Sequence, residues 1–453
     1  MKFKYPDSNS DHPKETSVDL VIQGGIALTM VPGQKPIDNA RILIRKDRIT
    51  HVGPSSRISI PQGFSGVTID ARNAIIMPGL VNGHAHTAMT LFRGFADDLP
   101  LKKWLFERIF PAEAQFLSPE TVYWGALLGC VEMITSGTTC VADGYFLEDR
   151  TVQAVHDSGL RAILAQGIID FPAPGVPDPK ENIRVGEDFL LKWHQFSDRI
   201  TPGLFCHSPG TCSEKTLKRS QEISGEYGAP LQIHLSETSE EVSETLKISG
   251  KRPAHYLDQL GLLDSHLIAA HGVHLDETEI QCLYKRGTSI IHVPESNMKL
   301  ASGVAPLEKF IAMGLKTGLG TDGCASNNNL DLFGEMDTAA KLAKAATGKP
   351  DVANAHQILK MATIEGAKAL GLGKETGSLE KGKKADIVVV DLNSPHLCPL
   401  FNPISTLVYS AGGADVKDVI INGVPLMKER TLCALDPDEI MAKVTELKQK
   451  IRL

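Results

Sequence analysis

Eight short apolar segments, each followed by a helical stretch, occupy the middle of this chain. They are MPGLVNGHAH, TTCVADGY, RAILAQGI, ITPGLFCHS, PLQIHLSE, HLIAAHGV, SIIHVPES and LKTGLGTDG. Strands that alternate with helices predict parallel β-α-β units, and eight such units are the number that closes a (β/α)8 barrel. We therefore expect an α/β fold with a TIM-like (β/α)8 barrel over residues 76–375. Its reactive groups should lie at the C-terminal ends of the strands.

The two ends of the chain carry a different pattern. Apolar and polar residues alternate between glycine turns in VDLVIQGGIALTM and ARILIRKDRITHVG, and again in ADIVVVDL and VKDVIINGVPLMKE. This alternation is typical of short antiparallel strands. It predicts one small β-sandwich domain built from both chain ends, residues 17–75 and 376–453, with a C-terminal helix in the second part. Residues 1–16 are expected to form a polar leader.

Net charge and composition indicate which class of binding partner to expect. The net charge of the 453 residues is -7 and the basic residues are spread along the chain, which argues against a nucleic-acid or anionic membrane surface. No segment has the apolar length of a membrane span or the pattern of a signal peptide, and the eight cysteines form no CxxC pair. We expect a cytoplasmic homo-oligomer that acts on a small molecule.

Histidines stand at the ends of several predicted strands. His84 and His86 would point to the same face of a strand, although roughly half such a pair is expected by chance among 15 histidines. Taken alone, the pair fits a metal site and a solvated or core pair about equally. His234 and Asp322 end two further strands, and three imidazoles with one carboxylate suit Zn²⁺, with Fe²⁺ as an alternative.

Two further ionisable residues are expected to face this site. Glu237 lies three residues after His234, and His271 ends the next predicted strand. A carboxylate beside a metal-bound water can take its proton and deliver it to a substrate, which is general acid/base catalysis. Without His234 beside it, Glu237 would be interpreted as a solvated loop residue. The proline-rich segment 170–182 is expected to form a long loop over the mouth of the barrel.

The segment MPGLVNGHAHTAMTLFRGFADDLPLKKWL resembles the amidohydrolase superfamily, and within it the deaminases of 5'-methylthioadenosine and S-adenosylhomocysteine. The resemblance runs from IQGGIALTM to KADIVVVDL and includes FCHSPGTCSE, IHLSET and LGTDGCASNNN. It implies that one metal is bound by an HxH pair, a fifth-strand histidine and an eighth-strand aspartate, here His84, His86, His234 and Asp322. The fourth strand ends in LFCHSPG, without the lysine of bimetallic relatives.

The same resemblance implies roles for the residues around the metal. Glu237 would be the proton shuttle, His271 would contact the metal-bound water, and both Glu237 and Asp322 would also contact the substrate. Glu113, in FPAEAQF, would bind the ribose hydroxyls, and His207, in CHSPGTCS, would contact the adenine base. Without the resemblance, Glu113 would be interpreted as a helix-surface residue and His207 would stay undecided.

The function predicted in this way is metal-dependent hydrolytic deamination of adenine in 5'-methylthioadenosine and S-adenosylhomocysteine, with 5'-deoxyadenosine or adenosine as further candidates. Guanine deaminases and triazine hydrolases share much of the framework, so another aromatic heterocycle is the alternative substrate. A non-catalytic scaffold is the alternative from another functional class. The complete set of predicted ligands together with Glu237 argues against that scaffold.

Overall fold

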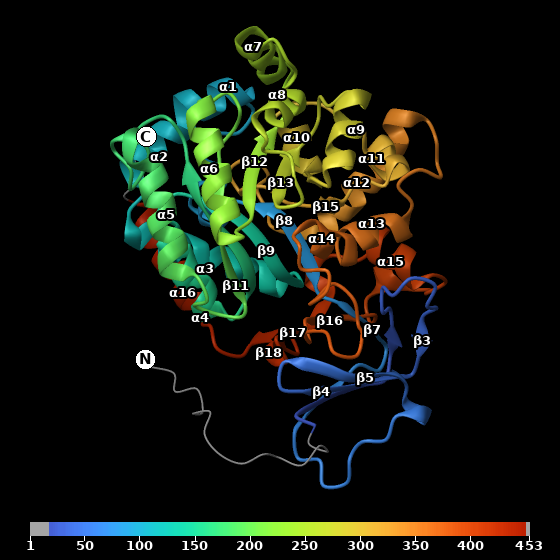
Figure 1. The fold of residues 1–453 in the computed structure, drawn as a ribbon. Coiled ribbons are helices and arrows are strands. Elements are labelled where there is room, and N and C mark those ends of the chain that lie inside the picture. The colour runs from blue at the N-terminus through green and yellow to red at the C-terminus, as the bar shows by residue number, and fades with distance from the viewer. Residues whose placement is uncertain (1–17, 450–453) are drawn as a thin grey trace.

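The centre of the protein is a closed barrel of eight parallel strands. The computed structural model describes residues 18–449, and in it the strands follow one another around the barrel in sequence order, with the last pairing to the first (Figure 1). This confirms the predicted (β/α)8 barrel. The strands are β8 (Leu80–Ala85), β9 (Thr138–Tyr145), β10 (Arg161–Ile168), β11 (Ile200–Cys206), β12 (Leu231–Leu235), β13 (Leu267–His271), β14 (Ser289–His292) and β15 (Thr317–Leu319).

Helices surround this barrel and cover its outer face, while the inner face of each strand lines the interior of the barrel. All residues of β9 and β10 are buried, including the polar residues Asp143 and Gln166. The helices are α1 (Leu101–Lys103), α2 (Phe110–Phe116), α3 (Pro119–Thr135), α4 (Glu148–Ser158), α5 (Asn182–Trp193), α6 (Glu214–Tyr227), α7 (Ser239–Ser249), α8 (Pro253–Leu260), α9 (Glu277–Arg286), α10 (Pro294–Lys299), α11 (Leu307–Met313), α12 (Leu332–Thr347), α13 (Ala355–Met361), α14 (Ile364–Ala369), α15 (Pro403–Tyr409) and α16 (Pro437–Lys448).

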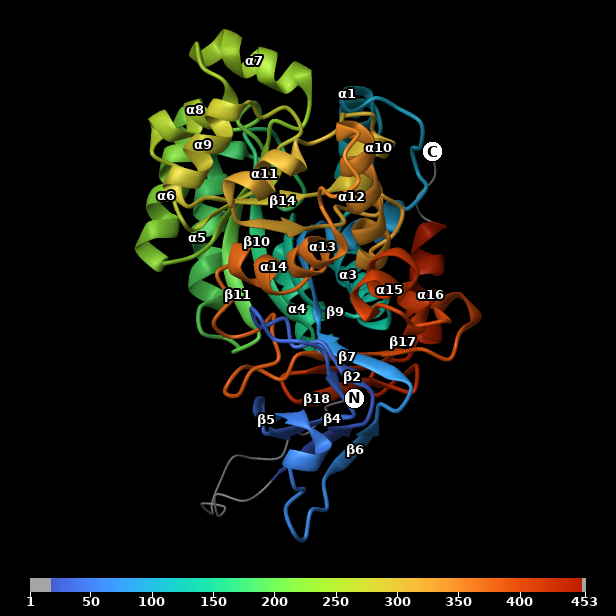
Figure 2. The same cartoon turned by 90° about the vertical axis from the view of Figure 1, so that its right-hand side faces the viewer.

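Two further sheets pack together below the barrel, at the N-terminal ends of its strands (Figure 2). One sheet has the order β5-β4-β1-β6, and the other has the order β19-β18-β17-β16-β7-β2-β3. Ile22 and Ile42 of the first sheet share a core with Ile76 and Ile387 of the second. The strands are β1 (Leu20–Gln23), β2 (Ile26–Ala27), β3 (Ile37–Asp38), β4 (Ala40–Arg45), β5 (Arg48–Pro54), β6 (Val67–Asp70), β7 (Ala74–Pro78), β16 (Ile387–Asp391), β17 (Val416–Ile421), β18 (Val424–Lys428) and β19 (Thr431–Leu432).

Both ends of the chain therefore contribute to this β-sandwich, as predicted. β7, from the N-terminal part, pairs antiparallel with β16, from the C-terminal part. One expectation was wrong in detail, because β1–β6 and β2–β7 are parallel pairs. Alternation of apolar and polar residues reports which face of a strand is buried, and it carries no information on the direction of the neighbouring strand.

The sandwich and the barrel are joined through a short connection. β7 ends at Pro78 and β8 begins at Leu80, and the glycine between them leaves no space for a side chain, since a Cβ there would lie 2.0 Å from Thr139 Oγ1. The last helices return to the barrel, where α15 packs on α12 and α13, and α16 packs on α3. The division at residues 76–375 stays a prediction, and the predicted leader, residues 1–16, lies outside the described residues.

No helix within residues 18–449 combines the length and the apolar composition needed to cross a membrane.

Candidate active site

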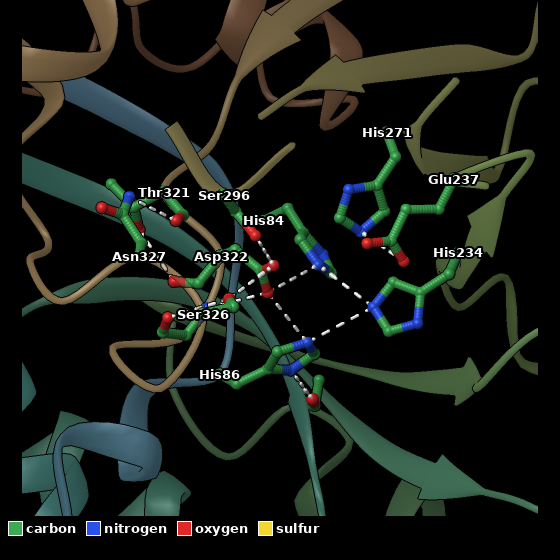
Figure 3. Close-up of polar contacts among 12 residues, drawn as sticks. His84, His86, His234, Glu237, His271, Ser296, Thr321, Asp322, Ser326 and Asn327 are labelled. Atoms are coloured by element: carbon green, nitrogen blue, oxygen red, sulfur yellow. Dashed lines mark hydrogen bonds and ion pairs between the residues drawn. The ribbon is translucent and has the colours of Figure 1, made fainter. Parts of the chain in front are cut away.

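The ionisable residues predicted from the sequence meet at the C-terminal end of the barrel. His84 lies in β8 and His86 directly after it, while His234 lies in β12. His271 ends β13, and Asp322 follows β15. Figure 3 shows their side chains directed toward a common point, with Glu237 beside them.

The three histidines that form a potential metal site present their Nε2 atoms to one another. His234 Nε2 lies 3.2 Å from His84 Nε2 and 3.3 Å from His86 Nε2. Tetrahedral ligands bound at the usual zinc–nitrogen distance lie about 3.3 Å apart. His86 Nδ1 donates to the backbone oxygen of Gly144 at 2.6 Å, so its Nε2 carries a lone pair, as metal-binding histidines require. These residues therefore fit a divalent metal ion.

The charge state of the histidines is consistent with this fit. Burial lowers the pKa of His84 to about 4 and holds the pKa of His234 well below its usual range. Both imidazoles are thus neutral at neutral pH, which is the form that binds a metal.

Asp322 completes the cluster on the side opposite His234. Its Oδ1 lies 3.3 Å from His86 Nε2 and 3.6 Å from His84 Nε2, while Oδ2 accepts hydrogen bonds from Ser296 and Ser326 at 2.6 and 2.8 Å. Burial alone would raise its pKa, but the hydrogen bond with His84 and the charges of the neighbouring histidines hold that pKa well below the usual range. The carboxylate is therefore ionised, with one oxygen available to the site.

Glu237 and His271 lie on the other side of the histidine cluster. Glu237 Oε2 is 3.8 Å from His271 Nε2, and Ser302 Oγ donates to Glu237 Oε1 at 3.3 Å. Asn297 Oδ1 lies 2.9 Å from His271 Nδ1. Burial raises the pKa of the Glu237 carboxyl, which brings it closer to the range useful for proton transfer at neutral pH.

Backbone strain marks the same strand ends. His271 and Asp322 have φ angles of 75° and 63°, in the left-handed region that residues other than glycine rarely adopt. Such conformations persist where the surrounding structure imposes them, and they concentrate at functional sites.

A cavity of about 740 Å³ opens above these residues, and its volume is typical of a small-molecule site. Its wall includes His86, Glu237, Asp322, Glu113 and His207, together with the aromatic side chains of Trp104, Phe106, Phe110, Phe146 and Phe171. Phe171 comes from the proline-rich loop that was predicted to cover the mouth of the barrel. Trp104 is buried and faces the cavity.

Glu113 and His207 line this cavity, each held by a neighbouring hydroxyl. Tyr145 donates to Glu113 Oε1 at 2.6 Å, and burial raises the pKa of Glu113 to about 7. The structure thus excludes the interpretation of Glu113 as a helix-surface residue. His207 Nδ1 lies 2.9 Å from Thr211 Oγ1, and burial lowers the pKa of His207 to about 3, so that its ring is neutral.

Several residues that hold the site together were missed by sequence reasoning. Ser296, Asn297 and Ser302 lie on or after the short helix α10, and Ser326 follows Asp322 in the next loop. Serine and asparagine are common in loops, so a single sequence contains no signal that separates these from others. His274 contacts the Ser302 carbonyl through Nε2 at 2.7 Å and so supports the same loop.

Known proteins resemble this chain over nearly its whole length. The model of the amidohydrolase family matches residues 75–426. A 5-methylthioadenosine/S-adenosylhomocysteine deaminase of Syntrophobacter fumaroxidans is 44% identical over 96% of this chain and 98% of its own. A 5'-deoxyadenosine deaminase of Methanosarcina mazei is also 44% identical, with the same coverage.

A solved structure is similar in three dimensions. The crystal structure of an adenosine deaminase from Xanthomonas campestris with bound zinc superposes with a TM-score of 0.93 at 37% sequence identity, covering 96% of this chain and 99% of that one. Together with the family match and the histidine cluster at the strand ends, these similarities show that the chain belongs to the amidohydrolase family.

Proposed function

We propose that this protein is a hydrolase of C–N bonds that deaminates the adenine ring of 5'-substituted adenosines. Its substrates would be 5'-methylthioadenosine and S-adenosylhomocysteine, with 5'-deoxyadenosine and adenosine as further candidates. The observation that carries the proposal is the meeting of the three histidines, Asp322 and the buried Glu237 at the base of one small-molecule cavity. The named activities of the relatives at 44% identity support it.

One divalent metal ion per subunit would be held by His84, His86, His234 and Asp322. Three neutral imidazoles and one carboxylate favour Zn²⁺, and Fe²⁺ is the alternative. When bound, such an ion would lower the pKa of water to about 7 and so supply a nucleophile at neutral pH.

Glu237 would move the protons of the reaction. Its carboxylate accepts a proton from the attacking water and delivers it to the ring nitrogen next to the amine-bearing carbon of adenine. Water oxygen then forms a bond to that carbon, and its remaining proton is transferred to the amine. The C–N bond breaks, and ammonia leaves to give the hypoxanthine product with its C=O bond. His271 and Asp322, which flank the same point, would orient the attacking water, and their fixed positions make no reorganisation necessary during the reaction.

Glu113 and His207 would bind the nucleoside. A carboxylate accepts hydrogen bonds from two neighbouring hydroxyl groups, which suits the ribose. His207 uses Nδ1 for its contact with Thr211, so the other ring nitrogen is available to the base. The Glu113 contact would distinguish a nucleoside from free guanine or a triazine, which have no ribose.

A panel of substrates tests the proposal. The zinc-loaded protein is incubated separately with 5'-methylthioadenosine, S-adenosylhomocysteine, 5'-deoxyadenosine, adenosine, guanine and a chlorotriazine, and release of ammonia or chloride is followed. We expect turnover of the adenine nucleosides, with the ultraviolet shift from adenine to hypoxanthine. Activity confined to guanine or the triazine would refute the substrate, and no activity at all with metal bound would refute the deaminase assignment.

Cytoplasmic location and assembly into homo-oligomers remain predictions from composition and resemblance. The net charge of -7 supports a small-molecule substrate over nucleic acid. Size-exclusion chromatography with light scattering would test the oligomer, and a monomer at micromolar concentration would contradict it.

A further inference from the structure

The turn that carries Glu237 is held by a second acidic residue, Glu241, in the first turn of α7. Glu241 Oε1 accepts the backbone N–H of Ser236 at 2.9 Å, and Oε2 accepts the backbone N–H of Glu237 at 2.8 Å. One carboxyl group therefore accepts hydrogen bonds from two consecutive amides, one on each of its oxygens.

This arrangement departs from ordinary helix capping. The sequence Thr238-Ser-Glu-Glu241 has the spacing of a capping box, in which the fourth residue returns to the N–H of the first. Thr238 does accept the N–H of Glu241 at 3.1 Å, but the Glu241 carboxylate reaches past Thr238 to the two preceding residues. The carboxylate thus acts on the catalytic turn and not only on its own helix.

Helix α9 shows the ordinary form at the same spacing. Asp276 accepts the N–H of Glu279 at 2.9 Å, and Glu279 Oε2 accepts the N–H of Asp276 at 3.1 Å, which closes the box. Glu279 and Glu241 occupy the same third position of their helices. Glu279 also accepts the N–H of Ala254 at 3.0 Å and binds Arg252 Nε at 2.8 Å. Both glutamates therefore bind groups outside their own helix cap, but only Glu241 binds the turn that carries Glu237.

Glu241 and one backbone hydrogen bond hold this turn, whereas the contacts of the Glu237 side chain itself are longer. Ser236 has a φ of 51°, a conformation that is unfavourable for a serine. The Glu237 side chain has longer contacts, at 3.3 Å from Ser302 and 3.8 Å from His271. On the other side of the turn, the Ser236 carbonyl accepts the N–H of His274 at 2.9 Å.

We propose that Glu241 is a positioning residue for the reaction, which fixes the backbone at residues 236–237 and thereby the direction of the Glu237 carboxylate. This inference rests on the proposed function, in which Glu237 transfers the proton. A displacement of about 1 Å in such a group costs roughly 100-fold in rate. Glu241 acts through Glu237 and has no role in holding the metal.

The test uses Glu241→Gln, which keeps the size of the side chain but leaves only one acceptor oxygen for two amides. We expect kcat to fall about 10- to 100-fold, with KM and the metal content of the holoenzyme unchanged. Glu279→Gln is the control for loss of a carboxylate from a helix cap, since Glu279 binds Asp276, Ala254 and Arg252 and makes no contact with residues 236–237. Its kcat should stay within about twofold of wild type. A Glu241→Gln enzyme with wild-type kcat, or one that loses metal in proportion to activity, overturns the proposal.

A double variant decides whether the effect passes through Glu237. In a Glu237→Gln background, Glu241→Gln should cause no further loss of the residual kcat, because residues that act as a unit are not additive. If Glu241→Gln lowers kcat in this background by the same factor as in wild type, Glu241 acts independently of Glu237, and the proposal would be wrong.

Amide hydrogen exchange provides a readout that needs no activity. In Glu241→Gln the amides of Ser236 and Glu237 should exchange faster than in wild type, whereas Glu279→Gln should leave them protected. Unchanged protection in Glu241→Gln would overturn the inference even if the enzyme deaminates adenosines. Conversely, if the wild type deaminates no adenine nucleoside, the proposed function fails, while faster exchange still shows that Glu241 holds the turn.

Discussion

The two ends of the barrel both bury charged groups, but they arrange them in opposite ways. At the N-terminal end, Arg161 makes two hydrogen bonds to Asp386 of the sandwich, at 2.7 and 3.2 Å, and Asn422 binds both partners. At the C-terminal end, His84, His86 and His234 turn their ring nitrogens toward one another at 3.2 and 3.3 Å.

This difference distinguishes polar groups that are buried to connect parts of the fold from polar groups that are buried at a functional site. In a buried pair of opposite charges, each group is the partner of the other. Such a pair connects two parts of the chain and adds little net stability. Three imidazole nitrogens that face one another have no such partner of opposite charge among themselves, and they suit a cation bound between them. Buried nitrogen ligands that converge on one point are therefore the better indicator of function.

The largest effect is expected from removing one of the convergent nitrogens. His234→Ala should lose the bound metal and lower turnover roughly 10⁴-fold, because activation of water by the ion contributes several kcal/mol. Metal content is measured by mass spectrometry alongside kcat. Zinc should raise the melting temperature of wild type and not of the variant. A variant that keeps one equivalent of metal and normal turnover would contradict the assignment of His234 as a metal ligand.

Glu237→Gln should have a smaller effect of a different kind. The variant keeps the size of the side chain and the bound metal, but it loses the carboxyl group that carries the proton. We therefore expect kcat to fall by about 10² to 10⁴. Glu222→Gln, on the exposed face of α6, serves as the control. Near-normal turnover of Glu237→Gln would refute its assignment as the proton shuttle.

At the opposite end of the barrel, Asp386→Asn should change stability and not chemistry. The substitution leaves the Arg161 guanidinium buried without its partner, and the free energy of unfolding should fall by about 3 to 5 kcal/mol. Urea denaturation measures this fall, and the folded variant should keep its kcat and metal. Replacing both partners, as Arg161→Met with Asp386→Leu, should recover much of the loss. A drop in kcat of the folded protein would contradict the structural assignment.

The smallest effect concerns the pH dependence of stability through Glu113. Burial raises its pKa from 4.5 to about 7, so the native state binds this proton more tightly than the unfolded state. The resulting stabilisation is complete below about pH 4.5, is lost as the pH rises to about 7, and amounts to at most about 3 kcal/mol. Glu113→Gln cannot ionise and lacks this contribution.

Unfolding of the metal-free proteins in urea, between pH 4.5 and 8, measures the difference in the free energy of unfolding between wild type and Glu113→Gln. The stability of wild type relative to Glu113→Gln should decline across this range and become constant above it. A difference that does not change with pH would show that Glu113 ionises in the native state as it does in water.

The residues of the site differ in how well they could be predicted from the sequence. His84, His86, His234 and Asp322 each end an apolar strand, so the periodicity that predicts the barrel also places them together. Glu113 became a candidate only through the family resemblance, because it lies on α2 after an irregular helical segment, Trp104–Ile109. Ser296 and Ser326, which hold Asp322, have no distinguishing pattern, since they come from loops that are adjacent only in space.

Local periodicity in the amino-acid sequence predicts the eight-stranded barrel, the sandwich from both chain ends and which groups stand at the strand ends. The geometry of a parallel barrel then gathers its strand ends on one face. The distances between histidine nitrogens, the pKa shifts from burial and the reach of Glu241 past its own helix cap arise only in the folded molecule. Those properties depend on which side chains meet across segments distant in the chain, and no local pattern specifies such contacts.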